Sequence, residues 1–276
     1  MLVIDLPCSK NKFVFQFDTE CRIVYEELSN LFYPYVTFAD ILPAEYDIVF
    51  VVKKDSINLF LNGAQIQQCP YSSLLALYKT IVGIIRDNIV LEDDFSLLHG
   101  AVLAHGTDAY ILLAESQMGK STLSMYLTTS SEFKCITDDL AIIHNKSYRI
   151  YPISKFLHVR KSALVLFDTE KFMDFSYNPL LDRYQHSLSN DRFSTEYVTK
   201  KIVILDRQNS INRISKLHFP CNEIVQNSYL PFQLKSNIVN SIILSQHIET
   251  WKIEYSTLQQ AHQYIKQISS NNTNYD

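Results

Sequence analysis

Residues 109–122 join an apolar run to a short polar loop that ends in Gly119-Lys120-Ser121. The apolar run, Ala109–Leu113, predicts a buried strand, and the segment after Ser121 has the apolar spacing of a helix. A strand that leads through such a loop into a helix is the arrangement that a phosphate-binding P-loop requires. This order of elements therefore predicts an anion site at the start of a helix.

Each polar position of this loop has a chemical use. Gly119 lets the backbone approach a phosphate, Lys120 can reach the β- and γ-phosphate oxygens, and the Ser121 hydroxyl can ligate Mg²⁺. The predicted cofactor is accordingly a triphosphate with Mg²⁺. The predicted phosphate-binding residues are Ala114, Glu115, Ser116, Gln117, Met118, Gly119, Lys120, Ser121 and Thr122.

One position departs from the G-x-x-x-x-G-K-[ST] pattern, because Ala114 stands where the first glycine is expected. Alanine costs little there if its φ is negative and destabilises the loop if its φ is positive. Glycine is scarce throughout, with 5 in 276 residues, and no two glycines are two positions apart. This spacing excludes a G-x-G-x-x-G dinucleotide fingerprint, and the scarcity excludes collagen-like and propeller folds.

Two further groups of polar residues flank the loop. Asp138-Asp139 follow a short apolar run, Phe133–Ile136, that predicts a strand. One carboxylate there can partner a nucleotide-bound Mg²⁺, and a second can accept the proton of an attacking hydroxyl. His99-Gly100 opens the strand pair before the loop. An Asp pair is more often a turn or a cap, and a lone His is more often structural, but their place around the loop favours a functional role.

The net charge, the cysteine spacing and the hydropathy indicate which partners and which cell compartment to expect. A net charge of −4 without a run of basic residues argues against nucleic acid. The 5 cysteines form no CxxC pair, which is typical of reduced thiols in a cytoplasmic protein. The N-terminus lacks a signal-peptide pattern, and the longest apolar stretch, Leu74–Ile85, is broken by Lys79 and too short to span a bilayer. We expect a cytoplasmic protein with no membrane partner.

The remaining chain divides into two expected parts. Residues 1–90 predict a small α+β lobe, rich in strands, with a hairpin turn at Asn62-Gly63 and a helix over 72–87 in which Gly83 is a close-packing position. Residues 91–276 predict the domain that carries the P-loop, with a mixed sheet, helices, and a closing strand and helix after Trp251. The polar stretch 168–200 predicts a long surface loop that closes over the acceptor, and 270–276 a frayed end.

These residues together resemble the HPr kinase/phosphorylase superfamily, in which H-G precedes a hairpin, a strand, G-x-S-G-x-G-K-S, a helix, a short strand and D-D. The resemblance covers about 97–165. The segment from Tyr151 to Arg160 is similar to the smaller HPr-kinase-like proteins, some of which phosphorylate precursor peptides in natural-product clusters, including lasso peptides. The resemblance implies an α+β or α/β fold with a P-loop kinase core of HPr-kinase type, after a small β-rich lobe.

The resemblance also implies roles. Lys120 and Ser121 would bind ATP and Mg²⁺, Asp138 would act as general base on a substrate serine, and Asp139 would lie near the metal. His99 would sit close to the phosphoryl group. The other implied contacts are a peptide or small protein as acceptor, a homo-oligomeric state, and Arg160 and Arg207 as phosphate or substrate partners.

Two departures qualify this assignment. Ala114 and Gln117 replace two loop glycines, and no glycine follows Gly119, so the glycine-containing segment of the bifunctional regulatory enzyme is absent. We therefore expect a serine kinase rather than that enzyme. Two alternatives stay open: a nucleotide-binding, peptide-binding protein without turnover, and a kinase of a free small molecule.

Overall fold

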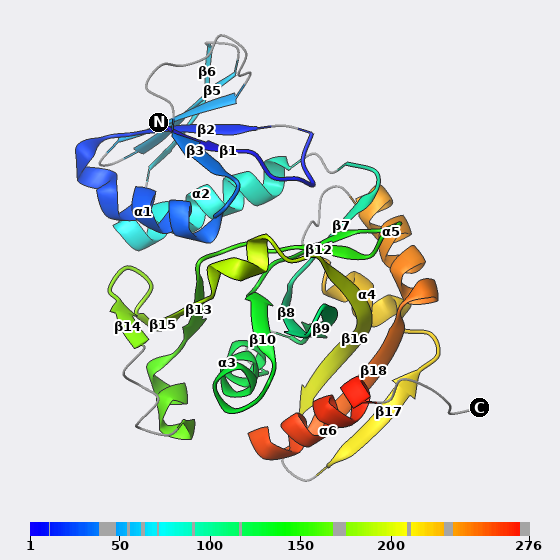
Figure 1. The fold of residues 1–276 in the computed structure, drawn as a ribbon. Coiled ribbons are helices and arrows are strands. Elements are labelled where there is room, and N and C mark those ends of the chain that lie inside the picture. The colour runs from blue at the N-terminus through cyan, green and yellow to red at the C-terminus, as the bar shows by residue number, and fades with distance from the viewer. Residues whose placement is uncertain are drawn as a thin grey trace.

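The computed structural model shows a mixed α/β molecule with a six-stranded, a nine-stranded and a three-stranded sheet (Figure 1). None of the described helices has the length and apolarity needed to cross a membrane. The residues that the structure describes are 1–10, 12–38, 48–53, 56–61, 64–70, 72–89, 92–115, 118–167, 175–208, 211–228 and 234–270.

The six-stranded sheet comes from the N-terminal part of the chain and has the order β3-β1-β2-β4-β5-β6. Its elements are β1 (Leu2–Ile4), β2 (Phe13–Phe17), η1 (Thr19–Cys21), α1 (Arg22–Leu31), β3 (Val36–Phe38), β4 (Ile48–Val52), β5 (Ser56–Leu61), β6 (Ala64–Pro70) and α2 (Leu74–Asn88). The short apolar runs predicted as strands fall within β1, β2, β4 and β5, whereas α1 was not predicted. The expected hairpin joins β5 to β6, with Leu61 opposite Ala64, and its turn residues Asn62-Gly63 lie outside the described residues.

Helix α2 confirms the prediction over 72–87. Ser73 is its N-cap, because the Ser73 hydroxyl accepts a hydrogen bond from the backbone N–H of Ala76 at 3.2 Å. Its innermost side chains include Leu77 and Ile81, both fully buried. The prediction for Gly83 was wrong: a Cβ added at Gly83 would have no atom within 4 Å, so close packing does not require a glycine there.

The nine-stranded sheet forms the rest of the frame, with β16 at its centre. β16 runs parallel to β9 and β18 and antiparallel to β12. The single strand predicted over Leu97–Ala104 is two strands, β7 and β8, interrupted at His99. The strands are β7 (Phe95–Leu98), β8 (Gly100–His105), β9 (Asp108–Leu113), β10 (Lys134–Thr137), β11 (Ala141–His144), β12 (Arg149–Tyr151), β16 (Tyr197–Arg207), β17 (Arg213–Leu217) and β18 (Glu249–Tyr255).

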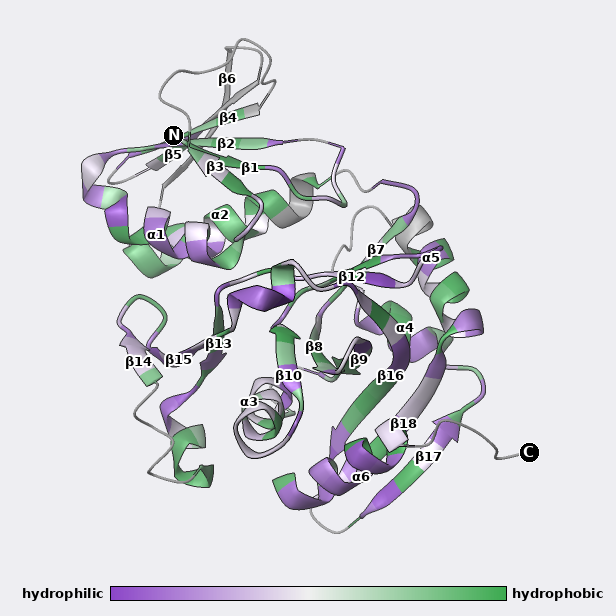
Figure 2. Ribbon diagram, viewed as in Figure 1, coloured by the Kyte–Doolittle hydropathy of each residue, from purple (hydrophilic) through white to green (hydrophobic). Residues whose placement is uncertain are grey.

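Helices cover both faces of this sheet. α3 (Lys120–Ser130) and α6 (Leu258–Ser270) pack on one face, and α4 (Cys221–Gln226) and α5 (Leu234–His247) pack on the other. Alternating residues of the strands serve the two cores: Leu112 and Val203 contact the first face, and Ile111 and Ile202 the second. Because both faces are covered, the middle of the central strand β16 is a continuous apolar run, Ile202–Leu205, which Figure 2 shows in green between more polar ends.

The third sheet replaces most of the surface loop predicted over 168–200. It has the order β13-β15-β14, built from β13 (Phe156–Val159), β14 (Phe175–Asn178) and β15 (Arg183–Ser187), with the 3-10 helices η2 (Lys161–Leu166) and η4 (Asn190–Phe193) beside it. The prediction failed because β14 and β15 are mostly half-buried or exposed and lack an apolar alternation. Residues 168–174 lie outside the described part.

The core of the N-terminal sheet continues into the rest of the molecule. Its cluster of buried side chains includes Phe13, Phe15 and Ile81 together with Ile142 and Ile153 from the following part of the chain. The core therefore crosses the boundary expected at residue 90, and the division into a lobe and a kinase-like domain stays a prediction.

Candidate functional site

Sheet topology brings the flanking polar residues to one edge. β9 and β10 both run antiparallel to β8, so both end where β8 begins. β16 and β18 are parallel to β9 and end at the same edge. Four segments therefore converge at this edge: the loop after β9, Asp138-Asp139 after β10, His99 before β8, and Arg207 at the end of β16.

Gly100 permits this convergence at the start of β8. It pairs with Leu113, the last residue of β9. A Cβ at Gly100 would lie 2.9 Å from the Leu113 Cδ2 atom and 3.0 Å from the Leu112 carbonyl oxygen. Such contacts are tight enough that a side chain at this position would push β9 away, so glycine favours the close approach of the two strands.

The His99 ring is fixed by the backbone of the Asp pair. Its Nδ1 atom lies 3.0 Å from the carbonyl oxygen of Asp139. A carbonyl only accepts, so Nδ1 carries the proton, and Nε2 of the neutral ring is an acceptor. Burial and the nearby Lys120 ammonium lower the pKa of His99. The ring is therefore neutral at physiological pH.

The loop backbone accommodates its unusual sequence. Among the described residues other than glycine, a positive φ occurs only at Asp139, Tyr148, Ser154 and Asp182, so Ala114 has a negative φ and no strain. Gly119 has a φ of 90°, which favours glycine, and it is the N-cap of α3. The buried Tyr255 of β18 fixes the loop from behind, since its hydroxyl donates to the Met118 carbonyl at 3.1 Å. Ser116 and Gln117 lie outside the described residues.

The first turn of α3 faces a cavity. It is lined by Gly119, Lys120, Ser121 and Thr122, and no side chain among the described residues caps the helix N-terminus. Unpaired N–H groups and the helix dipole make such a terminus attractive to anions. Lys120 is only 6% exposed, and burial lowers the pKa of its ammonium, with Asp139 and Asp138 opposing that shift. Its Nζ donates to the Ala114 carbonyl at 3.4 Å.

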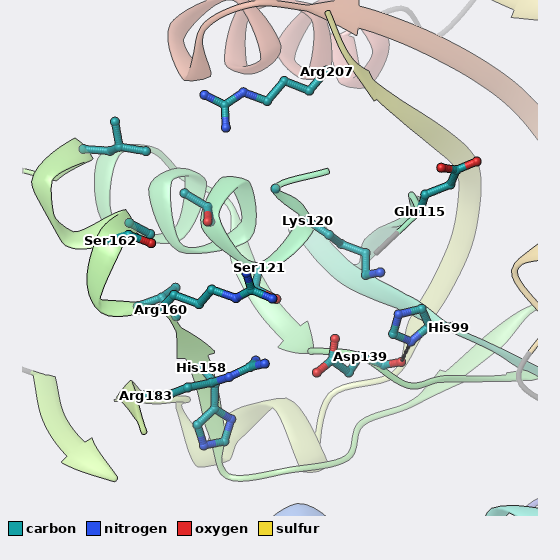
Figure 3. A pocket seen from close by; sticks show the side chains of 15 residues that line it. His99, Glu115, Lys120, Ser121, Asp139, His158, Arg160, Ser162, Arg183 and Arg207 are labelled. Carbon is teal, nitrogen blue, oxygen red and sulfur yellow. Dashed lines mark hydrogen bonds between the residues drawn. The ribbon is translucent and has the colours of Figure 1, made fainter. Parts of the chain in front are cut away.

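The cavity is about 360 Å³ and strongly cationic on a chain whose net charge is −4. Four basic side chains line it against two carboxylates, Glu115 and Asp139. In Figure 3, Arg207 approaches from the side of the loop opposite Arg160 and Arg183. Within the described part of the chain, no ion pair neutralises any of these arginines. The basic side chains are Lys120, Arg160, Arg183 and Arg207.

The two aspartates occupy different environments. Asp138 is 4% exposed and accepts a hydrogen bond from the Ser121 hydroxyl at 3.1 Å, while its other oxygen is buried without a partner among the described residues. Burial, reinforced by the neighbouring Asp139, raises the pKa of Asp138 to about 8. Asp139, with a φ of 64°, lines the cavity, whereas Asp138 does not. Asp138 therefore lies beneath the cavity floor.

These groups suit Mg²⁺ that arrives with a nucleotide. Among the described residues, no three His, Cys, Asp or Glu side chains gather into a ready metal cage. Mg²⁺ in nucleotide sites needs fewer protein ligands, because it takes one or two from the protein and the rest from phosphates and water. The Ser121 hydroxyl on the cavity wall fits that need, and the Asp138 carboxyl lies against that hydroxyl from beneath.

Most of the residues predicted from the sequence gather at this cavity. The predicted residues that line it are His99, Glu115, Gly119, Lys120, Ser121, Thr122, Asp139, Arg160 and Arg207. Ala114 and Asp138 lie beneath and contact Lys120 and Ser121. Arg183 and His158, which were not predicted from the sequence, also line the cavity. Arg183 fell in the stretch predicted as a loop, and nothing local marks it, because only the pairing of β13 with β15 brings it here.

Comparison with known proteins adds little to this geometry. No protein-family model matches the chain, and no curated protein matches it. Among solved structures, it is similar to the HPr(Ser) kinase/phosphatase from Coxiella burnetii, with 9% identity over 63% of this chain and 90% of that one, and a TM-score of 0.33. A likeness this weak carries no argument, so the site has to be judged by its own chemistry.

Proposed function

We propose that this cavity binds ATP with Mg²⁺ and that the protein is an HPr-kinase-like kinase, which transfers the γ-phosphoryl group to a serine hydroxyl of a small peptide or protein. One observation carries the proposal. Lys120, three arginines without an ion pair in the described part of the chain, and the N-terminus of α3 meet two aspartates at one sheet edge. A triphosphate needs this density of positive charge, and phosphoryl transfer needs the carboxylates.

The basic groups would bind and orient the triphosphate. Lys120 and the first-turn N–H groups of α3 would hold its β- and γ-phosphates, and Arg160, Arg183 and Arg207 would neutralise charge on the transferred group. Bound Mg²⁺ would neutralise phosphate charge, and Ser121 and Asp138 would hold it. Positioning and electrostatics of this kind supply most of the acceleration in phosphoryl transfer.

The geometry favours an exchange of the roles expected for the two aspartates. Asp138 is buried against Ser121, so it suits the metal side and not the acceptor. Asp139 lines the cavity and would take the proton from the attacking hydroxyl. The neutral His99, held by the Asp139 backbone, would present Nε2 as an acceptor beside it.

The test is incubation with ATP, Mg²⁺ and candidate peptides, followed by mass spectrometry for a gain of one phosphate. Asp139→Asn should bind ATP normally and lose about 100- to 10,000-fold in transfer rate, the usual contribution of a general base. Asp93→Asn, a change of an exposed carboxylate, serves as the matched control. If wild type binds ATP but phosphorylates no peptide, the kinase proposal is wrong; transfer to free serine alone would favour a small-molecule kinase.

A further inference from the structure

Helix α1 carries a buried carboxylate that lies outside the nucleotide cavity. Glu27 is 6% exposed, and its neighbour Glu26 is a surface residue paired with Arg22 at 2.7 Å. Burying a carboxylate is costly unless hydrogen bonds satisfy it. Burial also raises the pKa of Glu27, and the hydrogen bond from Asn178 opposes that rise. The position of Glu27 therefore depends on the groups that face it.

Those groups belong to the small sheet, far along the chain. The side-chain amide of Asn178, at the end of β14, donates to Glu27 Oε2 at 2.7 Å and lies 3.1 Å from Gln185 Oε1 in β15. The side-chain amide oxygen of Asn178 (Oδ1) accepts from the backbone N–H of Leu181 at 3.0 Å, within the turn of the hairpin. Asn178 thus connects α1 to both strands and to the turn between them.

The same network reaches two residues of the cavity wall. Asn178 is the register partner of Arg183, and Gln185 is the register partner of His158. The His158 Nε2 atom lies 3.7 Å from Glu27 Oε1. Arg183 and His158 line the cavity, as Figure 3 shows. A shift of this hairpin would therefore move an arginine that faces the phosphate site.

A second set of contacts joins the N-terminal part of the chain to the same three-stranded sheet. The backbone N–H of Lys155, just before β13, donates to the Asn30 carbonyl of α1 at 2.9 Å. The Lys155 ammonium lies 4.5 Å from the centre of the Tyr33 ring, and that ring packs edge-on against Phe193 at 4.9 Å. The start of β13 is thus held on α1, the pairing of β13 with β15 holds one strand of the hairpin, and Glu27 adds a contact to its other strand through Asn178.

We propose that Glu27 is a positioning residue for the nucleotide site: through Asn178 it sets the position of the β14–β15 hairpin, so that the N-terminal part of the chain determines how well Arg183 meets the phosphates. The inference rests on the proposed function in one respect, that Arg183 contacts a bound nucleotide. It gives α1, which no sequence motif connected to the site, an indirect part in shaping the cavity.

The experiment measures ATP affinity and steady-state kinetics of the full chain. Glu27→Ala should raise both the ATP dissociation constant and the KM for ATP about tenfold, the loss expected for one charge-assisted contact. Glu27→Gln should stay within about twofold of wild type, because its amide oxygen still accepts from Asn178. Glu26→Ala, one residue away on the exposed face, is the matched control and should have no effect.

A second variant tests the inference if Glu27→Ala folds poorly. A second measurement tests it if the protein does not bind ATP. Asn178→Ala should reproduce the Glu27→Ala effect, and the double variant should be no worse than either single one. Amide hydrogen exchange should become faster in 175–187 and stay unchanged in α3 for both variants. Wild-type ATP affinity in folded Glu27→Ala, or no rescue by glutamine, overturns the inference. If wild type does not bind ATP, the proposed function is wrong, and unchanged exchange in 175–187 would then overturn the positioning role separately.

Discussion

Asp138 shows how one buried side chain makes stability depend on pH. Burial raises its pKa to about 8, from an ordinary value of 3.8. The folded protein keeps this proton between those values and the unfolded chain does not, so its stabilising effect is complete at low pH and is lost as the pH rises through about 8. Asparagine has no such proton. The melting temperature of Asp138→Asn, measured relative to that of wild type, should therefore rise as the pH is raised from about 4 to about 8.

Thermal unfolding of both proteins across that range checks this expectation. The exposed Asp93→Asn should show no such trend, since the Asp93 side chain is 89% exposed. A constant difference between Asp138→Asn and wild type at every pH would mean that Asp138 titrates normally.

Lys120 should show a conflict between stability and binding. Burial lowers the pKa of the Lys120 ammonium, because the charge loses water. Among the described residues, the Ala114 carbonyl and the two aspartates compensate for part of that loss. Lys120→Met removes the buried charge and keeps the volume. We expect an unchanged or higher melting temperature without ligand, and ATP affinity about 10- to 100-fold weaker.

Calorimetry and ATP titration of the same samples separate the two effects. Lys134→Met is the matched control, because Lys134 is 60% exposed and pairs with Asp191. A large loss of stability in Lys120→Met would contradict the idea that the site keeps this lysine at a cost.

At the scale of elements, two glycines in helical contexts should respond oppositely to alanine. Gly119 starts α3 with a φ of 90°, which strains any other residue, so Gly119→Ala should lower the free energy of unfolding by about 1 kcal/mol. Gly83 lies inside α2 with open space around it, so Gly83→Ala should raise that free energy by about 0.5–1 kcal/mol. Urea unfolding of both variants tests this, and equal signs would contradict it.

The sequence analysis was most successful where local pattern and structure coincide. The apolar run before the loop, the helix start and the Asp pair are short-range signals, and β9, α3 and β10 confirm the elements that carry them. It failed where tertiary packing decides. α1 was missed and Glu27 with it, and the hairpin that carries Arg183 lacks the alternation by which strands are found. Long-range pairing, which no local pattern encodes, brings those residues to the site.

At the scale of the whole molecule, the shared core predicts cooperative unfolding. Side chains of the N-terminal sheet and of the following part pack in one cluster, with Phe15 and Ile142 among its buried members. Removing either part would expose apolar surface of the other. Calorimetry should therefore show a single transition whose van't Hoff and calorimetric enthalpies agree. Two resolved transitions would instead indicate two independently folding domains divided near residue 90.

The central place of β16 has a consequence for synthesis on the ribosome. Its Ile202 pairs with Ile111 of β9, translated long before, and with Thr250 of β18, translated later. β9 can pair with β8 early on one edge, but its other edge must wait unpaired until most of the chain has left the exit tunnel. Pairing over such distances is slow and exposes strands that aggregate. Nascent chains that stall before β16 should be the species that a chaperone recognises.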